Sequence, residues 1–419
     1  MALSNALFAG VSGLQANQAL LDVVGNNLAN ANTTGFKSQR VTFEDLVYQT
    51  LSPGSAAGDQ FGGTNPRQIG LGAAVSSIDS RFAQGAVQTT GRTLDLGIQG
   101  DGFFVVSNGQ QDFYTRAGAF SVDDLGYVVN ADGLRLQRTG TLGEATPAAP
   151  AFQVPGNADI RIPIGVGIPG TPTGTVNLRG NLSAGLATGD TFASGIQVYD
   201  TQGTEHLLTL TFTKTAANTF SVAAAVPGGT VSGSPVTGIA FNADGTLASP
   251  ASITLGLSYP PGLPVPQTVT VVLGTPGQGD GLTQFGGDST AAAISQDGST
   301  AGSLINYSID KDGTVQGLFS NGRKVPMAQV ALARFANDGG LLREGDNLFS
   351  LGTGSGSPLV GTPGSGRLGT VQSGALEASN VDMSGEFTQL ILAQRSYQMN
   401  AQSITVNNEV LQQLANIIR

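Results

Sequence analysis

The stretch NNLANANTTGFKSQ, residues 26–39, ends an apolar N-terminal segment and places four asparagines within seven residues. Asparagine tolerates the left-handed backbone that ends a helix, and Gly35 is a natural residue for the position just after a helix end. Thr33 and Thr34 are poor helix formers. The stretch therefore predicts the exit of a helix, with Phe36 anchoring the chain as it turns away.

A seven-residue period leads into this exit. Large apolar residues recur at this spacing, and Val11 fills one intermediate position. The period is typical of a helix of coiled-coil type. The residues that carry it are Leu7, Leu14, Leu21 and Leu28.

The C-terminal segment repeats the pattern. One line of residues at this spacing is large and apolar, namely Met383, Leu390, Tyr397, Ile404, Leu411 and Ile418. The line between them is mostly small or amide-bearing, namely Phe387, Gln394, Ala401, Asn408 and Ala415. Asp382 or Ser384 is suited to cap the start of this second helix. The shared period predicts that the two terminal helices pair; the alternative is that each packs on a globular core.

The outer faces of both helices carry almost no charge. Before Lys37 the only charged residue is Asp22, whereas a solvated helix face normally carries lysine and glutamate. Such faces favour contact with further copies of the chain, and head-to-tail contacts allow an open polymer. The residues expected to carry assembly are Leu7, Val11, Leu14, Leu21, Leu28, Asn30, Asn32, Gly35 and Phe36 at the N-terminal helix and its exit, and Met383, Phe387, Leu390, Tyr397, Ile404, Leu411 and Ile418 at the C-terminal helix.

The middle of the chain predicts an all-β structure. Residues 50–72 are rich in Gly, Ser and Pro and indicate an extended linker. Short β runs with Gly and Pro turns follow from residue 74, which favours sandwiches or barrels. The predicted fold is mainly β with terminal α-helices. Its parts are a helical assembly domain (1–34 and 380–419), a connector (35–73), a discontinuous first β domain (74–145 and 319–379) and a second β domain inserted into it (146–318).

Composition excludes several classes of function. The net charge of −10 over 419 residues argues against nucleic-acid binding, and the lack of cysteine removes disulfides and thiolate sites. The sequence lacks a basic signal-peptide region before Lys37 and a long apolar span, which predicts neither a cleaved leader nor membrane insertion.

No catalytic, cofactor or metal motif stands out. GVGIPG at residues 165–170 lacks the helix of a dinucleotide site, because Pro169 blocks it. DKDG at 310–313 lacks the other ligands of a calcium loop and predicts a hairpin turn. The single histidine, His206, has no nucleophile motif beside it. We therefore expect a protein without cofactors that is not an enzyme.

Four segments carry a family resemblance. NNLANANTTGFK resembles the N-terminal signature of the rod and hook family of bacterial flagellar axial proteins. LDLGIQGDGFFVV with YTRAGAFSVDDLGYVVNADGLRLQ is similar to the family's first β domain, LGTVQSGALEASNVDM to the block before its last helix, and FTQLILAQRSYQMNAQSITVNNEVLQQL to that helix. Residues 146–318 are an insertion that distal rod proteins lack, and FASGIQVYDTQGTEHLLTLTFTK within it resembles the hook-type branch.

The resemblance implies a function. A hook-type member polymerises into a short, curved, flexible tube that serves as a universal joint and transmits torque from rod to filament. The paired helices would form the inner tube, where Gln398, Asn400, Gln402, Asn407 and Gln412 are candidates to line a polar channel. Implied partners are further copies, rod proteins, the hook cap, the hook–filament junction proteins and the flagellar type III export apparatus. The implied location is extracellular, in the hook.

Two other functions stay open on the sequence. A distal rod-type protein with an unusual insertion would form a straight, stiff polymer. A β-domain surface adhesin would bind a ligand through the insertion and would not need its terminal helices.

Overall fold

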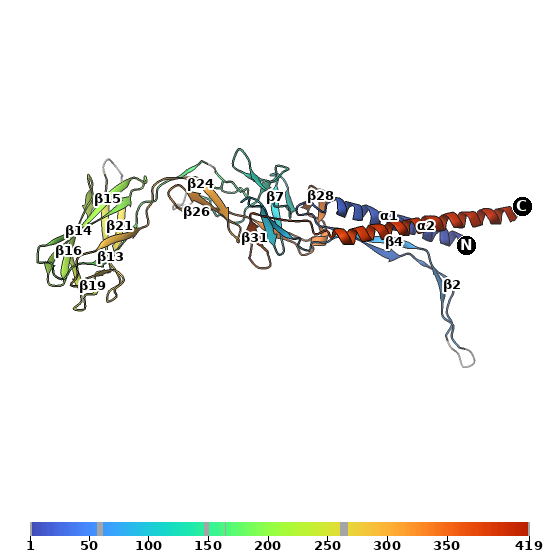
Figure 1. Cartoon of the computed structure of the whole chain (residues 1–419), viewed down its shortest axis with the longest axis horizontal. Helices are drawn as coiled ribbons and strands as arrows, with labels where there is room; N and C mark the ends of the chain where they lie inside the picture. Colours follow the sequence, from blue (N-terminus) through green and yellow to red (C-terminus); the bar gives the residue numbers. More distant parts are fainter. Residues whose placement is uncertain (1, 57–61, 146–150, 164, 260–266, 418–419) are drawn as a thin grey trace. The chain divides into compact units, whose positions relative to one another are not determined.

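The computed structural model describes residues 2–56, 62–145, 151–163, 165–259 and 267–417. Helix α1 spans Ala2–Ala29 and helix α2 spans Met383–Ile417. The described residues between the helices form strands, turns and one short 3-10 helix (Figure 1). The predicted class, mainly β with terminal helices, is confirmed.

The chain forms two compact units. The first comprises Met1–Ile162, Tyr307–Gln316 and Pro326–Arg419, and the second comprises Pro163–Asn306 and Gly317–Val325. The second unit is therefore inserted into the first, with its start at Pro163 rather than at residue 146. Residues 146–150 lie outside the described ranges.

The first unit contains one large sheet and several short strand pairs. The large sheet runs in the order β28-β29-β8-β7-β11-β10-β9, and β27 pairs with both β7 and β30. Its strands are β7 Phe103–Ser107, β8 Asp112–Thr115, β9 Ser121–Val122, β10 Val128–Val129, β11 Arg135–Leu136, β27 Leu332–Arg334, β28 Leu342–Gly345, β29 Leu348–Ser350 and β30 Leu359–Gly361. The short pairs are β5 Val87–Thr89 with β32 Ala375–Glu377, and β6 Leu96–Gln99 with β31 Thr370–Ser373.

The core of this unit is aromatic. Phe103 lies edge-on to Phe349 and also contacts Phe335, with ring centroids 5.8 Å apart in both pairs. Tyr114 meets Phe335 edge to face at 4.8 Å. Strands β7, β8, β27 and β29 supply or flank these rings, so residues from both halves of the discontinuous unit form one core.

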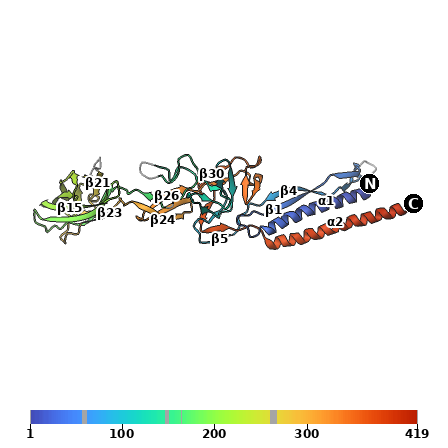
Figure 2. The ribbon, with the colours of Figure 1, turned by 90° about the horizontal axis from the view of Figure 1, so that it is seen from above.

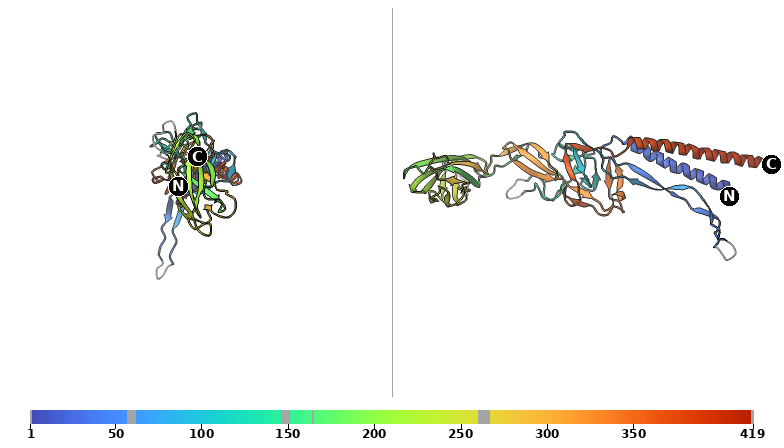
Figure 3. Two further views of the ribbon diagram at one scale, coloured as in Figure 1. Left: turned by 90° about the vertical axis from the view of Figure 1, so that its left-hand side faces the viewer. Right: turned by 60° about the horizontal axis from the view of Figure 1, so that its bottom comes forward.

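The described residues of the predicted connector, 35–56 and 62–73, contain strands of a β ribbon. Strand β1 (Gln39–Asp45) pairs antiparallel with β4 (Ala73–Ser80), and β2 (Tyr48–Ser52) pairs with β3 (Arg67–Gly70). The views in Figure 3 show this ribbon extending away from the large sheet. The Gly, Ser and Pro residues around positions 53–66 mask the strand signal, because the pairing partners are separated by turn-forming residues.

The second unit is a two-sheet sandwich. One sheet runs β14-β15-β16-β18-β19, and the other runs β17-β20-β21-β13-β22 with β23 also on β13. The bounds are β13 Thr175–Asn181, β14 Thr191–Tyr199, β15 Glu205–Ala216, β16 Thr219–Ala225, β17 Thr230–Ser232, β18 Val236–Phe241, β19 Leu247–Ser249, β20 Ser252–Ser258, β21 Gln267–Val272, β22 Leu282–Thr283 and β23 Ala292–Gln296. Both sheets bury alternate residues in one shared core, as in β15, where Leu208, Leu210 and Phe212 are buried.

Four further strands lie near the points where the chain crosses between the units. They are β12 Gly167–Ile168, β24 Gly302–Ile309, β25 Thr314–Phe319 and β26 Lys324–Gln329. The DKDG segment forms the turn between β24 and β25, where the N–H of Gly313 donates to the carbonyl of Asp310 at 2.9 Å. The hairpin prediction for this segment is confirmed.

We expect residues 170–300 to fold alone. Every residue of the sandwich core lies within this fragment, and its ends are joined by two hydrogen bonds between Thr171 and Ser299, of 2.9 and 3.0 Å. Thermal unfolding followed by circular dichroism should show one cooperative transition of a monomer. Phe212→Ala should lower the free energy of unfolding by about 3–5 kcal/mol, because the side chain is fully buried. A fragment without a cooperative transition would contradict this expectation.

Candidate functional site

The two terminal helices form an antiparallel pair. Asn27 donates to Glu386 across the pair at 3.1 Å. A Cβ placed on Gly13 would lie 2.6 Å from Nδ2 of Asn400, and a Cβ on Gly10 would lie 3.0 Å from Ile404. As positions along α1 decrease, their partners on α2 increase, which defines the antiparallel direction. The predicted pairing of the helices is confirmed, and the glycines allow the close approach.

The side of α2 that faces α1 differs in part from the predicted one. Leu390 and Ile404 are half-buried, as expected, but the second buried line contains Ala393, Asn400 and Asn407. The expected second line is exposed at Phe387, Gln394 and Asn408, and Phe387 alone exposes 48% of its surface. Positions three and four residues apart both neighbour each other on a helix, so a seven-residue period does not choose between the two lines. Small Ala393 suits the glycine-bearing partner, whereas Phe387 would hold the helices apart.

The other predicted residues of α2 lie mostly on open surface. Met383, Tyr397 and Leu411 are exposed, and Ile418 lies outside the described residues. Asp382 caps the helix, because its Oδ1 accepts from the N–H of Ser384 at 3.1 Å. Of the five amide residues expected to line a channel, Gln398, Gln402 and Gln412 are exposed, whereas Asn400 and Asn407 lie half-buried on the α1 side.

Helix α1 lies between α2 and the β1–β4 ribbon, as Figure 2 shows. Ser12 accepts from the N–H of Ala73 at 3.3 Å, and Asn5 donates to Gln49 at 2.8 Å. Leu7, Leu14, Leu21 and Leu28 are half-buried, and Val11 is exposed. This ribbon contact is not evident from the sequence, because the Gly-, Ser- and Pro-rich stretch within residues 35–73 is typical of a connector.

Asn27 joins three elements at the end of α1. Its side chain donates to the carbonyl of Gln39 and accepts from the N–H of Gln39, both at 2.8 Å, in addition to its bond to Glu386. The side chain is buried with only 1% of its surface exposed. The residues predicted from the sequence were Asn30 and Asn32 instead. The missed signal is that Asn27 lies seven residues after Leu20 and fourteen after Gly13, on the line that faces α2.

The other asparagines close the helix end locally. Asn30 donates to the carbonyl of Asn26 at 3.0 Å and accepts from Thr33 at 3.1 Å, and Asn32 is exposed. None of the four takes the left-handed conformation that the sequence analysis expected, since their side chains satisfy the turn. Side-chain hydrogen bonds of this type compete with helix continuation.

Gly35 does not directly follow the helix end, because α1 ends at Ala29. It has a φ of +72°, and its N–H donates to the carbonyl of Glu377 at 2.8 Å. A Cβ at this position would lie 2.5 Å from the backbone nitrogen of Ala117. Only a glycine leaves room for this close contact with the backbone of Ala117, which lies far away in the sequence. The expectation that Gly35 caps the helix is therefore corrected.

A buried cluster of charges fixes the chain after Gly35. Lys37 contacts Glu377 at 2.6 Å, and Arg116 contacts the other oxygen of Glu377 at 3.2 Å. The side chains of Lys37 and Glu377 are 0% exposed. Glu377 also accepts from the N–H of Gly85, and Lys37 also donates to the carbonyl of Ala83. Burial lowers the pKa of Lys37 from its ordinary value, while the charge and hydrogen bond of Glu377 oppose that shift.

Two more side chains secure this junction. Arg343 donates to the carbonyl of Lys37 at 2.5 Å and lies over the rings of Phe36 and Phe349. Asn380 accepts from the N–H of Ser38 at 2.7 Å and donates to the carbonyl of Ala83 at 2.9 Å. Phe36 is buried beneath Arg343, so the chain is anchored directly after Gly35.

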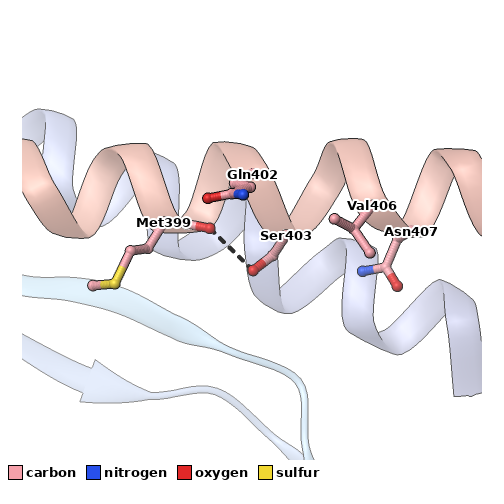
Figure 4. Close-up of a pocket in the computed structure, with 5 residues that line it drawn as sticks. All are labelled: Met399, Gln402, Ser403, Val406 and Asn407. Atoms are coloured by element: carbon pink, nitrogen blue, oxygen red, sulfur yellow. Dashed lines mark hydrogen bonds between the residues drawn. The ribbon is translucent and has the colours of Figure 1, made fainter.

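The surface of α2 that flanks its contact with α1 is open and partly apolar. Met399 exposes 61% and Val406 exposes 50% of its surface. These two residues line a hollow of about 490 Å³ together with Gln402, Ser403 and Asn407 (Figure 4). Ser403 bonds back to the carbonyl of Met399 at 3.0 Å, so its hydroxyl is used within the helix.

The single histidine lies between two neighbouring side chains. His206 contacts Asp200 at 3.1 Å and stacks on Tyr259 at a centroid distance of 3.8 Å. Burial and the nearby Asp200 raise the pKa of Tyr259 to about 12. Among the described residues, no group of three or more metal-ligating side chains is present. Within the same ranges, no helix is both long and apolar enough to span a membrane.

Comparison with known families gives matches along most of the chain. Residues 7–37 match the family described as "Flagella basal body rod protein", and residues 372–417 match "Flagellar basal body rod FlgEFG protein C-terminal". Residues 97–184 match "Flagellar hook protein FlgE/F/G D1 domain", and residues 183–299 match "Flagellar basal body protein FlaE D2 domain".

Individual proteins are similar over their full length. The flagellar hook protein FlgE of Borreliella burgdorferi is 37% identical, with 99% of this chain and 100% of that protein covered. The flagellar hook protein FlgE of Escherichia coli is 36% identical, with 97% and 98% covered. The flagellar basal-body rod protein FlgG of Bacillus subtilis is 30% identical, with 99% and 98% covered.

A solved structure shares the fold. The crystal structure of Helicobacter pylori flagellar hook protein FlgE2 matches with a TM-score of 0.53 at 16% identity, covering 70% of this chain and 100% of that chain.

The buried carboxylate of Glu377 gives a testable prediction. Glu377→Gln should lower the free energy of unfolding of the first unit by about 3–5 kcal/mol, because it leaves two buried cations without their anion. Lys37→Met should cost less, since Glu377 keeps Arg116. Arg40→Gln, at an exposed ion pair with Asp79, should cost about 1 kcal/mol or less. Differential scanning calorimetry measures all three, and equal costs for Glu377→Gln and Arg40→Gln would refute the prediction.

The close backbone contact at Gly35 gives another prediction. Gly35→Ala should destabilise the first unit by more than Gly91→Ala. Both glycines have positive φ, but a Cβ on Gly91 meets no atom within 4 Å. Gly91→Ala should therefore cost only the backbone strain, about 1–2 kcal/mol. Chemical denaturation compares the two, and an equal loss would show that close contact at Gly35 is unimportant.

Proposed function

The chain belongs to the flagellar hook protein family, and on this premise we propose how its parts build a hook. It is a structural subunit of the bacterial flagellar hook, a short curved tube that acts as a universal joint between rod and filament. The function of this family is mechanical, so the relevant chemistry is that of contact between subunits.

One observation carries the proposal. The terminal helices pair with each other, yet the pair leaves large apolar side chains exposed on both helices. Phe8 of α1 exposes 67% of its surface, and Met399 of α2 exposes 61%. Exposed apolar side chains on faces with so few charges are typical of surfaces that are covered in an assembly. Copies of the helix pair would cover each other's faces and form the inner wall of the tube.

The junction supplies the rigid part of the joint. Bending a rotating tube requires some contacts to stay fixed while others move. The buried contacts of Glu377 with Lys37 and Arg116 hold the exit of α1 and the entry to α2 on one β unit. We propose that this junction stays fixed within each subunit and that the contacts between subunits adjust on bending.

We propose that the residues named from the sequence take part in assembly, some through contacts between copies and others through contacts within the helix pair. Exposed Phe387, Met383, Tyr397 and Val11 would contact neighbouring copies, whereas half-buried Ile404 would hold the pair together. Gly35 and Phe36 would set the direction in which the chain leaves the inner wall.

A distal rod protein is the second candidate in the same family. The similarity to a rod protein supports it, but the second unit has its own sandwich core and matches a D2 domain of the family. We therefore favour the hook. An adhesin would leave the exposed helix faces unexplained.

Partners and location follow from the same proposal. The subunit would contact further copies of itself, rod proteins at one end, and the hook cap and the hook–filament junction proteins at the other. It would leave the cell through the flagellar type III export apparatus and function outside it, without cofactor, metal, nucleic acid or membrane insertion.

Assembly of the purified full-length chain tests the function. Electron microscopy should show curved tubes at high protein concentration, and a chain ending at residue 382 should stay monomeric in sedimentation experiments because it lacks α2. Straight, stiff tubes would favour the rod protein. A full-length chain that stays monomeric at high concentration and salt would overturn the assembly argument.

A further inference from the structure

Two isolated charges lie on opposite sides of the helix pair. Asp22 is the only charged residue in α1, and α2 contains Glu386, Arg395 and Glu409. Glu386 is engaged by Asn27. In the part of the chain that the structure describes, neither Asp22 nor Arg395 has an ion-pair or side-chain hydrogen-bond partner, and both residues are exposed.

Asp22 points away from the buried side of α1. Val24 and Asn27 are the most buried of the described residues of this helix, each with 1% of its surface exposed, and Asp22 lies two residues before Val24. Two residues correspond to about 200° around a helix, which places Asp22 on the opposite side. The same open face carries exposed Val11, about three turns earlier, and exposed Phe8.

Arg395 has the matching position on α2. It lies two residues after Ala393, which is 1% exposed and faces α1. Arg395 therefore points away from α1 by about 200°. Exposed Ile391 lies one turn before it on the same face. Within one chain the two charges face in opposite directions, so they do not meet.

Both charges lie at nearly the same height along the pair. The contacts of Gly13 with Asn400 and of Asn27 with Glu386 set the register. This register places Asp22 level with Ile391, one helical turn or about 6 Å from Arg395. A copy placed beside another at a similar height would bring the acidic face of one α1 against the basic side chain of the neighbouring α2.

We propose that the open face of α1 docks on the open face of α2 of a second copy, and that Asp22 pairs there with Arg395. This inference rests on the proposed function. Such a contact joins two different faces, so it repeats without closing on a dimer. A symmetric contact would instead place Asp22 against Asp22, which is repulsive. Because the surrounding residues are uncharged or apolar, the pair would be shielded from water and would specify register.

Charge reversal tests the pair. Asp22→Lys and Arg395→Glu should each raise the critical concentration for assembly by at least about tenfold, since each places like charges in contact. The double variant should return to within about threefold of the parent chain. Sedimentation of the polymer measures this concentration, and circular dichroism confirms that each variant keeps its helices. Single variants that assemble like the parent would overturn the inference.

Mixing the two single variants locates the pair. In an alternating copolymer every interface would contain one acidic and one basic partner, so an equimolar mixture should assemble where each variant alone does not. Rescue in the double variant without rescue in the mixture would place the pair within one chain and overturn the inference.

Glu409→Lys is the matched control. Glu409 lies on the same face of α2 as Arg395 but fourteen residues further on, about 21 Å away. Its reversal should change the critical concentration by less than about threefold, and an effect as large as that of Arg395→Glu would also overturn the inference. Failure of the parent chain to assemble would instead count against the proposed function.

Discussion

The carboxylate of Glu377 is the group on which the arrangement of the first unit depends. It forms ion pairs with Lys37 and Arg116 and accepts a hydrogen bond from the N–H of Gly85. The backbone carbonyl of Glu377 accepts a hydrogen bond from the N–H of Gly35. Together with Glu377, these residues come from four separate parts of the sequence. A buried anion is stable only when donors surround it, so each segment is held at a defined distance from the others. Glu377 therefore lies close to both the exit of α1 and the entry to α2, although these two points are far apart in the sequence.

Much of the architecture could be predicted from the sequence. The seven-residue periods identified both helices and their pairing, because such a pattern depends only on local geometry. Short β runs separated by Gly and Pro turns predicted that the middle of the chain is β, for the same reason. The DKDG turn and the cap at Asp382 follow from short-range chemistry, which the sequence contains in full.

The parts that the sequence did not reveal depend on contacts between distant residues. Asn27 was missed because its partners, Gln39 and Glu386, lie on two other elements. The second buried line of α2 was placed one residue too late, because a seven-residue period fits the lines of Ala393 and Phe387 equally well. The cluster around Glu377 was missed altogether, although an isolated lysine and glutamate in weakly charged surroundings are a usable signal for a buried pair.

The sandwich has a consequence for how such a chain changes over evolution. Its polypeptide enters at Thr171 and leaves at Ser299, and these residues are hydrogen-bonded neighbours. A module whose entrance and exit coincide can grow, shrink or be exchanged for another while the host chain keeps its own path. Variation within this module is thereby separated from the helix pair, whose exposed side chains we propose to contact neighbouring copies. Surface diversity and mechanical constancy can then coexist in a single polypeptide.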